Sequence, residues 1–295
     1  MNSNDSGKKP LLMTSRICRE SDFRSPWYEH WRLRIAKGAP ELQSGEESVW
    51  GLVWEGMQGK WMHRKLWEWC AIAQALFERG MLSENRQGMG FAVGKEPLAS
   101  LFAAQGVQVV ASDFIDEVTP AKWGTTGQLA TGLDATHWPG LVAEDVYRTR
   151  VRFMNVDMRN LRPLPHEKFH FVWSSCAFEH LGSLKAGIEF VLGAMRLVRR
   201  GGLAVHTTEY NISSNRKTVS KGDIVIYRRR DIEKMDRLLE KIGCKIESID
   251  FNPGTDPNDL SFDYPSYYSH GRQHIKLSLL GHITSSILLI VRKFQ

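Results

Sequence analysis

Apolar residues recur with two different spacings from residue 87 onward. Short, dense apolar runs predict seven strands, and longer segments with helical spacing predict helices between them. The expected strands cover 87–93, 107–114, a short piece within 151–161, 168–175, 202–210, 244–251 and 284–294, and the expected helices cover 96–106, 186–202 and 229–244. Strands that alternate with helices of this length indicate a parallel sheet with helices on both faces.

The end of the chain breaks this alternation. Residues 252–283 join the last two expected strands, are rich in Pro, Asp and Tyr, and show no long helical pattern. An antiparallel closing pair fits such a connection better than another crossover helix. We therefore expect an α/β fold with a seven-stranded, mostly parallel sheet and an antiparallel C-terminal pair.

The chain divides into three parts. Residues 1–24 are polar and are expected to be loose. Residues 25–82 hold seven of the ten tryptophans, and the stretch 59–82 has helical spacing, which predicts a helical cap. These tryptophans either pack helices onto the sheet or form an aromatic wall that faces a ring-bearing substrate. Residues 83–295 form the main domain, with an insertion at 115–150 that is too long for a simple connection.

Composition and charge exclude only a few classes of protein. The net charge of +6 is spread along the chain, so no concentrated basic face points to nucleic acid. The four cysteines lie far apart and form no CxxC pair, which indicates reduced thiols. The first residues lack the apolar run of a signal peptide, and the run 287–291 is too short to span a bilayer. We expect a cytoplasmic protein, and peripheral membrane contact stays open.

Candidate ligand-binding residues follow the expected strands. In GFAVGKEPLASL, Gly90 and Gly94 flank a turn between a strand and a helix, and glycines let the backbone approach a ligand closely. Asp113 ends the next strand, where nucleotide-binding α/β folds place an acid that accepts hydrogen bonds from ribose. Asp157 and Ser174 follow at the third and fourth strands. All lie at carboxyl strand ends, the edge at which open α/β sheets bind ligands.

The order of these motifs resembles class I S-adenosylmethionine-dependent methyltransferases, which have a Rossmann-like sheet. The resemblance covers roughly residues 85–295 and rests on GFAVGKE, ASDF, NVDMRNL, FHFVWSSCAFEHLGSL and RLVRRGGLAVHTTEYN. It implies cofactor contacts by Gly90, Ala92, Gly94 and Glu96 near the methionine part, Asp113 at the ribose, Asp157 and Met158 at the adenine, and Ser174 at the sulfonium. The family's turn usually reads GxGxG. Since alanine is the smallest replacement, we expect the turn to survive Ala92 with a slightly altered approach.

The expected chemistry is O-methylation. Methyl transfer needs alignment of nucleophile, methyl group and sulfur, and a hydroxyl acceptor also needs a general base. Candidates are His180, His206 and Glu209, with His274 reaching from the closing loop. Each also has a structural interpretation: a helix cap, a core histidine or a salt-bridged carboxylate. These residues and Glu179 would suit a divalent metal, which is possible but not expected because no two carboxylates have tight ligand spacing.

Aromatic and polar residues also suggest a substrate wall. The candidates are Trp123, Gln128, Tyr264, Tyr267, His270 and His274, with Tyr268 and Arg272 beside them, and the alternative is an ordinary surface loop. The blocks SSCAFEHLGSL and HTTEYN resemble proteins linked to bacterial surface polysaccharides, which implies a sugar hydroxyl as acceptor. Three alternatives stay open: a small-molecule or lipid methyltransferase, an NAD-dependent oxidoreductase, and a non-catalytic scaffold. The sequence does not indicate the oligomeric state.

Overall fold

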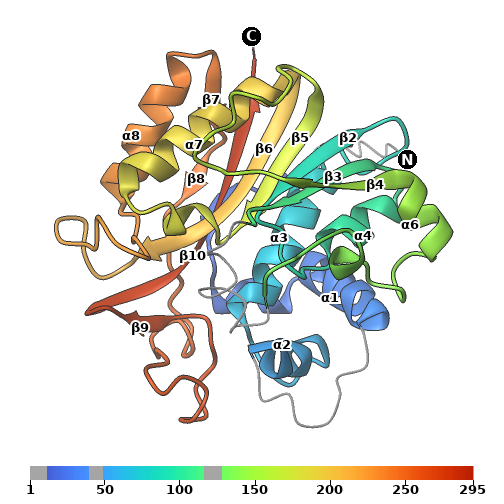
Figure 1. The fold of residues 1–295 in the computed structure, drawn as a ribbon. Helices are drawn as coiled ribbons and strands as arrows, with labels where there is room; N and C mark the ends of the chain where they lie inside the picture. The colour runs from blue at the N-terminus through green and yellow to red at the C-terminus, as the bar shows by residue number, and fades with distance from the viewer. Residues whose placement is uncertain (1–11, 40–48, 116–127, 295) are drawn as a thin grey trace, which may run out of the picture.

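One mixed sheet runs through the described part of the chain, residues 12–39, 49–115 and 128–294 of this computed structural model (Figure 1). Its strands follow the order β4-β3-β2-β5-β6-β10-β1-β8, and β7 and β9 also pair with β10. The parallel part consists of β2 (Gln87–Phe91), β3 (Gln108–Asp113), β4 (Val151–Asn155), β5 (Phe169–Ser175) and β6 (Val198–Asn211). Their carboxyl ends therefore meet at one edge of the sheet.

The antiparallel closing strand is present as predicted. β10 (His282–Lys293) pairs with β6 from Thr284 to Arg292, antiparallel throughout. Residues 287–291 are fully buried, because β10 lies inside the sheet with helices on both faces. The predicted strand 244–251 is split into β7 (Cys244–Ile246) and β8 (Ile249–Asp250). The Rossmann-like α/β architecture expected from the sequence is confirmed.

The start of the chain corrects one expectation. Ser15–Ile17 form β1, which pairs antiparallel with β10 and parallel with β8. A short 3₁₀ helix, η1 (Glu20–Arg24), follows. The prediction of a loose segment is therefore wrong for residues 15–24. Three residues are too few to show a strand period, and this strand forms because β10 offers it an unpaired edge. A further strand, β9 (Leu277–Leu279), forms a hairpin with β10.

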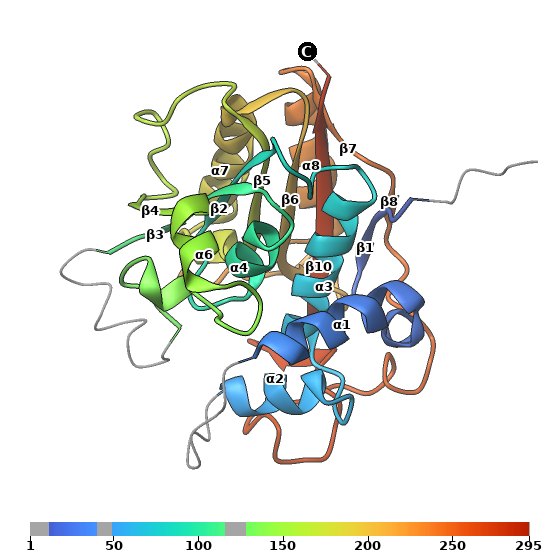
Figure 2. The same cartoon turned by 90° about the vertical axis from the view of Figure 1, so that its right-hand side faces the viewer.

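Helices cover both faces of the sheet (Figures 1 and 2). One face carries α1 (Pro26–Gly38), α3 (Arg64–Phe77), α4 (Leu98–Ala103) and α6 (Glu144–Arg150). The opposite face carries α7 (Leu184–Leu197) and α8 (Arg229–Glu240), and α2 (Val49–Met57) packs on α1 and α3. Among its described residues, the segment 115–150 contains η3 (Asp134–Thr136) and α6. A further 3₁₀ helix, η4 (Phe178–His180), follows β5.

The tryptophans of the N-terminal helices serve mainly as core residues. Trp31, Trp67 and Trp69 are at most 1% exposed, and α3 packs against β5, β6 and β10. Their indole N–H groups also donate hydrogen bonds: Trp67 Nε1 donates to Asp22 at 3.0 Å and Trp31 Nε1 donates to Gln74 at 2.7 Å. Trp69 additionally lines the cavity described below. Packing therefore explains Trp31 and Trp67, whereas Trp69 both packs and faces the site.

Candidate active site

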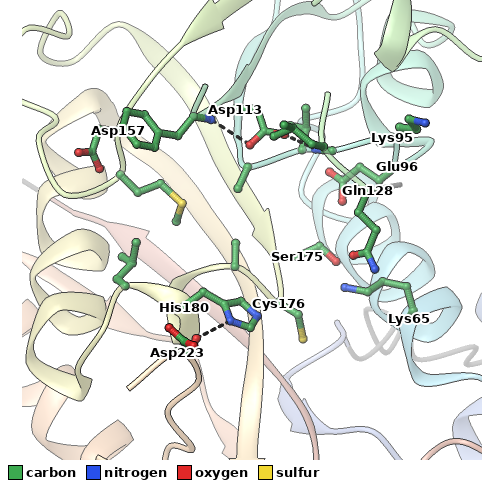
Figure 3. Close-up of a pocket in the computed structure, with 18 of the residues that line it drawn as sticks. Lys65, Lys95, Glu96, Asp113, Gln128, Asp157, Ser175, Cys176, His180 and Asp223 are labelled. Atoms are coloured by element: carbon green, nitrogen blue, oxygen red, sulfur yellow. Dashed lines mark hydrogen bonds between the residues drawn. The ribbon is translucent and has the colours of Figure 1, made fainter. Parts of the chain in front are cut away.

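A cavity of about 470 Å³ opens at the carboxyl ends of β2, β3 and β5 (Figure 3). Small-molecule sites typically span roughly 300–1,000 Å³. Its wall combines the turn after β2, the ends of β3 and β5, the segment after β4, and residues of α2 and α3. The cavity therefore lies where parallel α/β sheets bind their ligands.

The turn after β2 forms one wall. Ala92, Gly94 and Glu96 line the cavity, as the sequence predicted. Gly94 has φ +52°, and a Cβ on it would lie 2.5 Å from the carbonyl oxygen of Gln128. Gly90 is different: it lies inside β2, does not line the cavity, and a Cβ on it would lie 2.3 Å from the Trp173 ring. The structure therefore does not place Gly90 in the cavity wall, and this glycine makes room for an indole ring.

Ala92 occupies a backbone conformation that favours glycine. Its φ is +47°, in the left-handed region. We expect Ala92→Gly to raise the free energy of unfolding by about 0.5–1 kcal/mol. A left-handed backbone conformation costs a residue with a Cβ about 1–2 kcal/mol, and glycine avoids this cost. The greater conformational entropy of glycine in the unfolded chain offsets part of the gain. Urea denaturation checks this. Ala36→Gly in α1 is the control and should lower stability by about 1 kcal/mol; equal losses in both variants would contradict the strain at Ala92.

Asp113 lies at the centre of the cavity wall. Its carboxylate accepts backbone N–H bonds from Gly94 at 3.2 Å, Ala130 at 3.1 Å and Phe114 at 2.9 Å. Burial raises the pKa of Asp113, and the three N–H donors act in the opposite direction. This one side chain therefore holds the turn after β2 against the segment that follows β3. It also lines the cavity at the strand end where a ribose is expected.

The end of the cavity beyond Asp113 is apolar with a charged rim. Phe114, Asp157 and Met158 line it, together with Arg159. Arg159 forms a salt bridge with Asp157 at 2.9 Å, and its guanidinium lies 5.4 Å from the centre of the Phe114 ring. The ring of Phe114 and the thioether of Met158 offer apolar surface to the flat face of a base such as adenine. The structure thus places Asp157 and Met158 in the wall of the cavity, and their contact with adenine stays a prediction.

Strand alternation corrects the prediction for Ser174. Successive side chains of a strand point to opposite faces. Ser174 faces the α7 side, is fully buried, and its Oγ lies 2.8 Å from His206 Nδ1. Ser175, one residue later, lines the cavity. With helices on both faces, both faces of β5 are buried, so the sequence pattern alone does not distinguish them.

The same alternation of side chains along a strand directs His206 away from the cavity, so His206 is not a candidate base. His206 pairs with Ser174 across β5 and β6, is fully buried and does not line the cavity. Burial lowers its pKa to about 3. Phe178 and Phe190 pack edge-on against its ring. His206 is a neutral core histidine, which is the structural interpretation that the sequence left open.

Glu209 is likewise a structural residue. It is 1% exposed, and its carboxylate forms a salt bridge with Arg64 at 2.8 Å, away from the cavity lining. Glu179 is buried too and accepts a hydrogen bond from Thr208 at 3.0 Å. Both carboxylates are therefore engaged in structural interactions. Within the described ranges, no group of three or more His, Cys, Asp or Glu side chains is arranged to hold a metal ion.

His180 is the predicted base that reaches the cavity. It ends η4, just beyond β5, and lines the wall together with Leu181 and Asp223 (Figure 3). Its Nδ1 lies 2.8 Å from the carbonyl oxygen of Asp223. A carbonyl oxygen only accepts, so Nδ1 carries the proton and donates it. In the neutral ring the lone pair is then on Nε2.

The expected substrate wall is mostly elsewhere. Gln128 lines the cavity, but Tyr264, Tyr267, His270 and His274 are not among its lining residues. Tyr264 stacks on His270 at a ring distance of 3.9 Å, and Tyr267 donates its hydroxyl to the Ser278 carbonyl at 2.8 Å. These residues organise their own loop, which corrects their assignment as lining residues. Trp123 lies outside the described residues.

His274 belongs to a buried chain of hydrogen bonds. Its Nδ1 donates to Asp263 at 2.8 Å, and its Nε2 accepts from the Tyr268 hydroxyl at 3.1 Å. His63 Nε2 lies 3.3 Å from that hydroxyl, and His63 Nδ1 accepts from the backbone N–H of Lys65. Burial lowers the pKa of His274 to about 2, so the chain is neutral at its histidines. It fixes the C-terminal loop to the start of α3.

Two charged residues of α3, Lys65 and Glu68, were not predicted from the sequence as site residues. Lys65 lines the cavity, and its Nζ lies 3.0 Å from Glu68 Oε2. Glu68 is fully buried and also accepts hydrogen bonds from Ser175 and Cys176 at 3.0 Å. Their spacing of three residues on an amphipathic helix resembles an ordinary surface ion pair. Only the packing of α3 onto the end of β5 brings them to the site.

Part of the chain matches a known protein family. Residues 90–206 match a family model described as a methyltransferase domain. No curated protein matches the chain. Magnesium protoporphyrin IX methyltransferase from Synechocystis PCC 6803, solved with bound SAH, is 14% identical, covers 92% of this chain and 97% of its own, and has a TM-score of 0.47. Phosphoethanolamine N-methyltransferase 2 from Haemonchus contortus, solved with S-adenosyl-L-methionine, is 15% identical, covers 77% of this chain and 53% of its own, and has a TM-score of 0.47.

The cavity residues fit S-adenosylmethionine. An apolar end with Phe114 and Met158 suits the adenine, Asp113 suits the ribose, and the Lys65 ammonium and the Glu96 carboxyl group suit the amino-acid end. With the Rossmann-like sheet and the match over residues 90–206, these features identify a methyltransferase domain that uses S-adenosylmethionine. The matched segment runs from β2 to β6. In the described parts of the chain, no helix is both long and apolar enough to cross a membrane.

Proposed function

We propose that the protein methylates a hydroxyl oxygen of its acceptor and that His180 is the general base. The observation that carries this proposal is the hydrogen bond from His180 Nδ1 to the Asp223 carbonyl at the cavity wall. It sets the tautomer whose Nε2 accepts a proton. A hydroxyl needs such a base, because its own pKa lies far above neutral pH.

Different residues of the chain position the reacting groups and accept the proton. Bound S-adenosylmethionine supplies a methyl group that is already activated by the sulfonium. Asp113 and the turn at Gly94 hold the cofactor end of the cavity in place, which aligns the reacting atoms. His180 Nε2 takes the hydroxyl proton as the oxygen attacks. The Asp223 carbonyl, which accepts from Nδ1, then stabilises the positive ring that results.

For the acceptor we propose a sugar, in line with the motifs that resemble proteins of bacterial surface polysaccharides. Trp69 supports a ring-bearing acceptor, because it lies in the cavity wall beside Lys65. Gln128 and Asp223 add hydrogen-bonding groups at other places in the cavity lining. Sugar rings suit such a wall, since their C–H faces pack on indoles and their hydroxyls pair with polar side chains.

The test is an acceptor screen followed by a substitution. Free hexoses, deoxyhexoses, nucleotide sugars and amino alcohols are incubated with S-adenosylmethionine, and mass spectrometry locates the added methyl group. With the acceptor that reacts, we expect His180→Ala to lower kcat by about 100- to 10,000-fold. Binding of S-adenosylhomocysteine should change less than about twofold, since His180 acts on the acceptor.

His180→Gln is the matched control, because it keeps a hydrogen-bonding side chain but supplies no base. It should be as inactive as His180→Ala. Methylation on nitrogen would contradict the O-methyltransferase proposal. Near-normal kcat in either variant would exclude His180 as the base.

A further inference from the structure

A second cavity, of about 390 Å³, lies between the segment that follows β4 and helix α7. Figure 1 shows this segment crossing the sheet toward α7. Met158 and Arg159 line both cavities, so the second one adjoins the apolar end of the first. Its size lies within the range of small-molecule sites. The cofactor does not account for it, since the groups that suit S-adenosylmethionine line the first cavity.

The lining of the second cavity carries an excess of positive charge. Three arginines line it: Arg159, Arg162 and Arg196. The lining has one carboxylate, that of Glu189, which lies 3.5 Å from the ammonium of Lys185. In the described part of the chain, no carboxylate forms a salt bridge with Arg162 or Arg196. These two guanidinium groups therefore face the cavity without an anion to balance them.

Backbone hydrogen bonds hold one side of this cavity together. The N–H groups of Glu167 and Lys168 donate to the carbonyls of Arg196 and Leu197 at 3.0 and 2.9 Å, which fixes the loop before β5 to the end of α7. As a result, Arg196 Nη2 lies 3.1 Å from His166 Nε2. A guanidinium only donates, so Nε2 accepts and the neutral ring carries its proton on Nδ1. The pair thus adds further N–H donors to the lining.

A glycine inside α7 keeps the cavity open. Gly193 lines the cavity, although glycine weakens a helix interior relative to alanine. A Cβ at this position would meet only the Leu161 side chain, at 3.5 Å, which is ordinary van der Waals contact. Packing therefore does not require a glycine here. A larger side chain would occupy the cavity instead.

Apolar side chains complete the lining, among them Leu161, Phe190 and Leu197. A ligand that matches the whole cavity combines an anionic group with an apolar body. Guanidinium groups bind phosphate oxygens through parallel N–H donors, and two unpaired guanidinium groups suit a dianion.

We propose that the second cavity binds a small phosphate ester, with Arg162 and Arg196 on the phosphate group and Phe190 beside the organic part. The site adds a ligand to the protein that is neither the cofactor nor the methyl acceptor in the first cavity. It does not depend on which atom of the acceptor is methylated.

Phenyl phosphate is the probe, because it joins a phosphate group to an apolar ring. Titration calorimetry at low ionic strength is carried out with saturating S-adenosylhomocysteine, which occupies the first cavity. We expect saturable one-to-one binding of phenyl phosphate. Inorganic phosphate should bind about 10-fold more weakly, since it buries no apolar surface. Arg162→Met and Arg196→Met should each weaken phenyl phosphate about 10- to 100-fold, as for a lost charged hydrogen bond.

Two further variants separate the cavity from the net charge. Gly193→Leu fills the cavity without changing a charge and should weaken phenyl phosphate at least about 10-fold. Arg237→Met removes the same charge from the last turn of α8, outside the cavity lining, and should bind like wild type. Binding of S-adenosylhomocysteine within about twofold of wild type shows that each variant is folded.

Several results would overturn the proposal. The first is the absence of phenyl phosphate binding to the wild type. Equal weakening by Arg237→Met and Arg162→Met would show an effect of net charge alone, and full binding by Gly193→Leu would place the ligand elsewhere. Vesicles that contain phosphatidic acid present a phosphate ester on a membrane. Binding to these vesicles without binding to phenyl phosphate would exclude a soluble ligand.

Discussion

Replacing Glu68 with alanine is expected to lower the free energy of unfolding by about 3–5 kcal/mol, as for a buried ion pair that loses one partner. Glu68 is fully buried and connects four elements of the fold. Its partners are Lys65 on α3, Ser175 and Cys176 at the end of β5, Thr207 on β6 and Ser286 on β10. Removing the carboxylate leaves these mostly buried donors without their acceptor, which costs more free energy than the hydrogen bonds contributed.

The Glu68 prediction also has a pH dependence. Burial would raise its pKa, but Lys65, Arg64 and the hydrogen bonds from Ser286 and Cys176 lower it to about 2 from an ordinary value of 4.5. Because the folded-state pKa is the lower one, this stabilisation is complete above about pH 4.5. It is lost as the pH falls toward 2. Glu68→Gln should therefore show a weaker loss of stability over this range than wild type.

Glu189→Ala is the control for Glu68→Ala. Glu189 lies on α7, and its pair with Lys185, 3.5 Å apart, is largely exposed. Such pairs contribute about 0.3–0.5 kcal/mol. Urea denaturation of both variants at pH 7 measures the difference. Similar small losses in both variants would contradict the account of Glu68 as the connection between α3 and the sheet.

Much of the fold and the cofactor end of the site could be predicted from the sequence. The strands have dense apolar runs because helices cover both faces of the sheet, and this pattern is visible without a structure. Polar residues that interrupt such runs at their ends mark the rim of the sheet. Asp113, Asp157 and His180 were found this way, and all three line the cavity.

The face of the sheet to which each side chain points could not be predicted in the same way. In a strand buried on both faces, neighbouring positions have similar composition, so Ser174 and Ser175 were indistinguishable. The same holds for His206, which β6 directs into the core. Lys65 and Glu68 could not be found from their own neighbourhood either, since their partners on β5, β6 and β10 are more than 100 residues away.

Replacing Asp113 with alanine is expected to weaken binding of S-adenosylhomocysteine at least about 100-fold. Each hydrogen bond from a ribose hydroxyl to a charged carboxylate contributes about 1.5–3 kcal/mol. The variant also removes the acceptor for the backbone N–H groups of Gly94 and Ala130, which loosens the turn beside the cofactor. Asp113→Asn should lose less, because its amide oxygen still accepts one of these bonds.

Asp134→Ala is the matched control for this substitution. The Asp134 side chain is 81% exposed and pairs with Arg148 at the surface. Its loss should leave the affinity for S-adenosylhomocysteine unchanged. An equal loss in both variants would show that the effect of Asp113→Ala does not arise at the cavity.

The most direct test of the account is titration calorimetry of the wild type with S-adenosylmethionine, S-adenosylhomocysteine and NAD(H), repeated with Asp113→Ala. We expect micromolar binding of the first two ligands, loss of that binding in the variant, and no binding of NAD(H). Absence of S-adenosylmethionine binding would contradict the methyltransferase assignment. Binding of NAD(H) in its place would move the protein to the oxidoreductases that share its glycine turn and its acid at the end of β3.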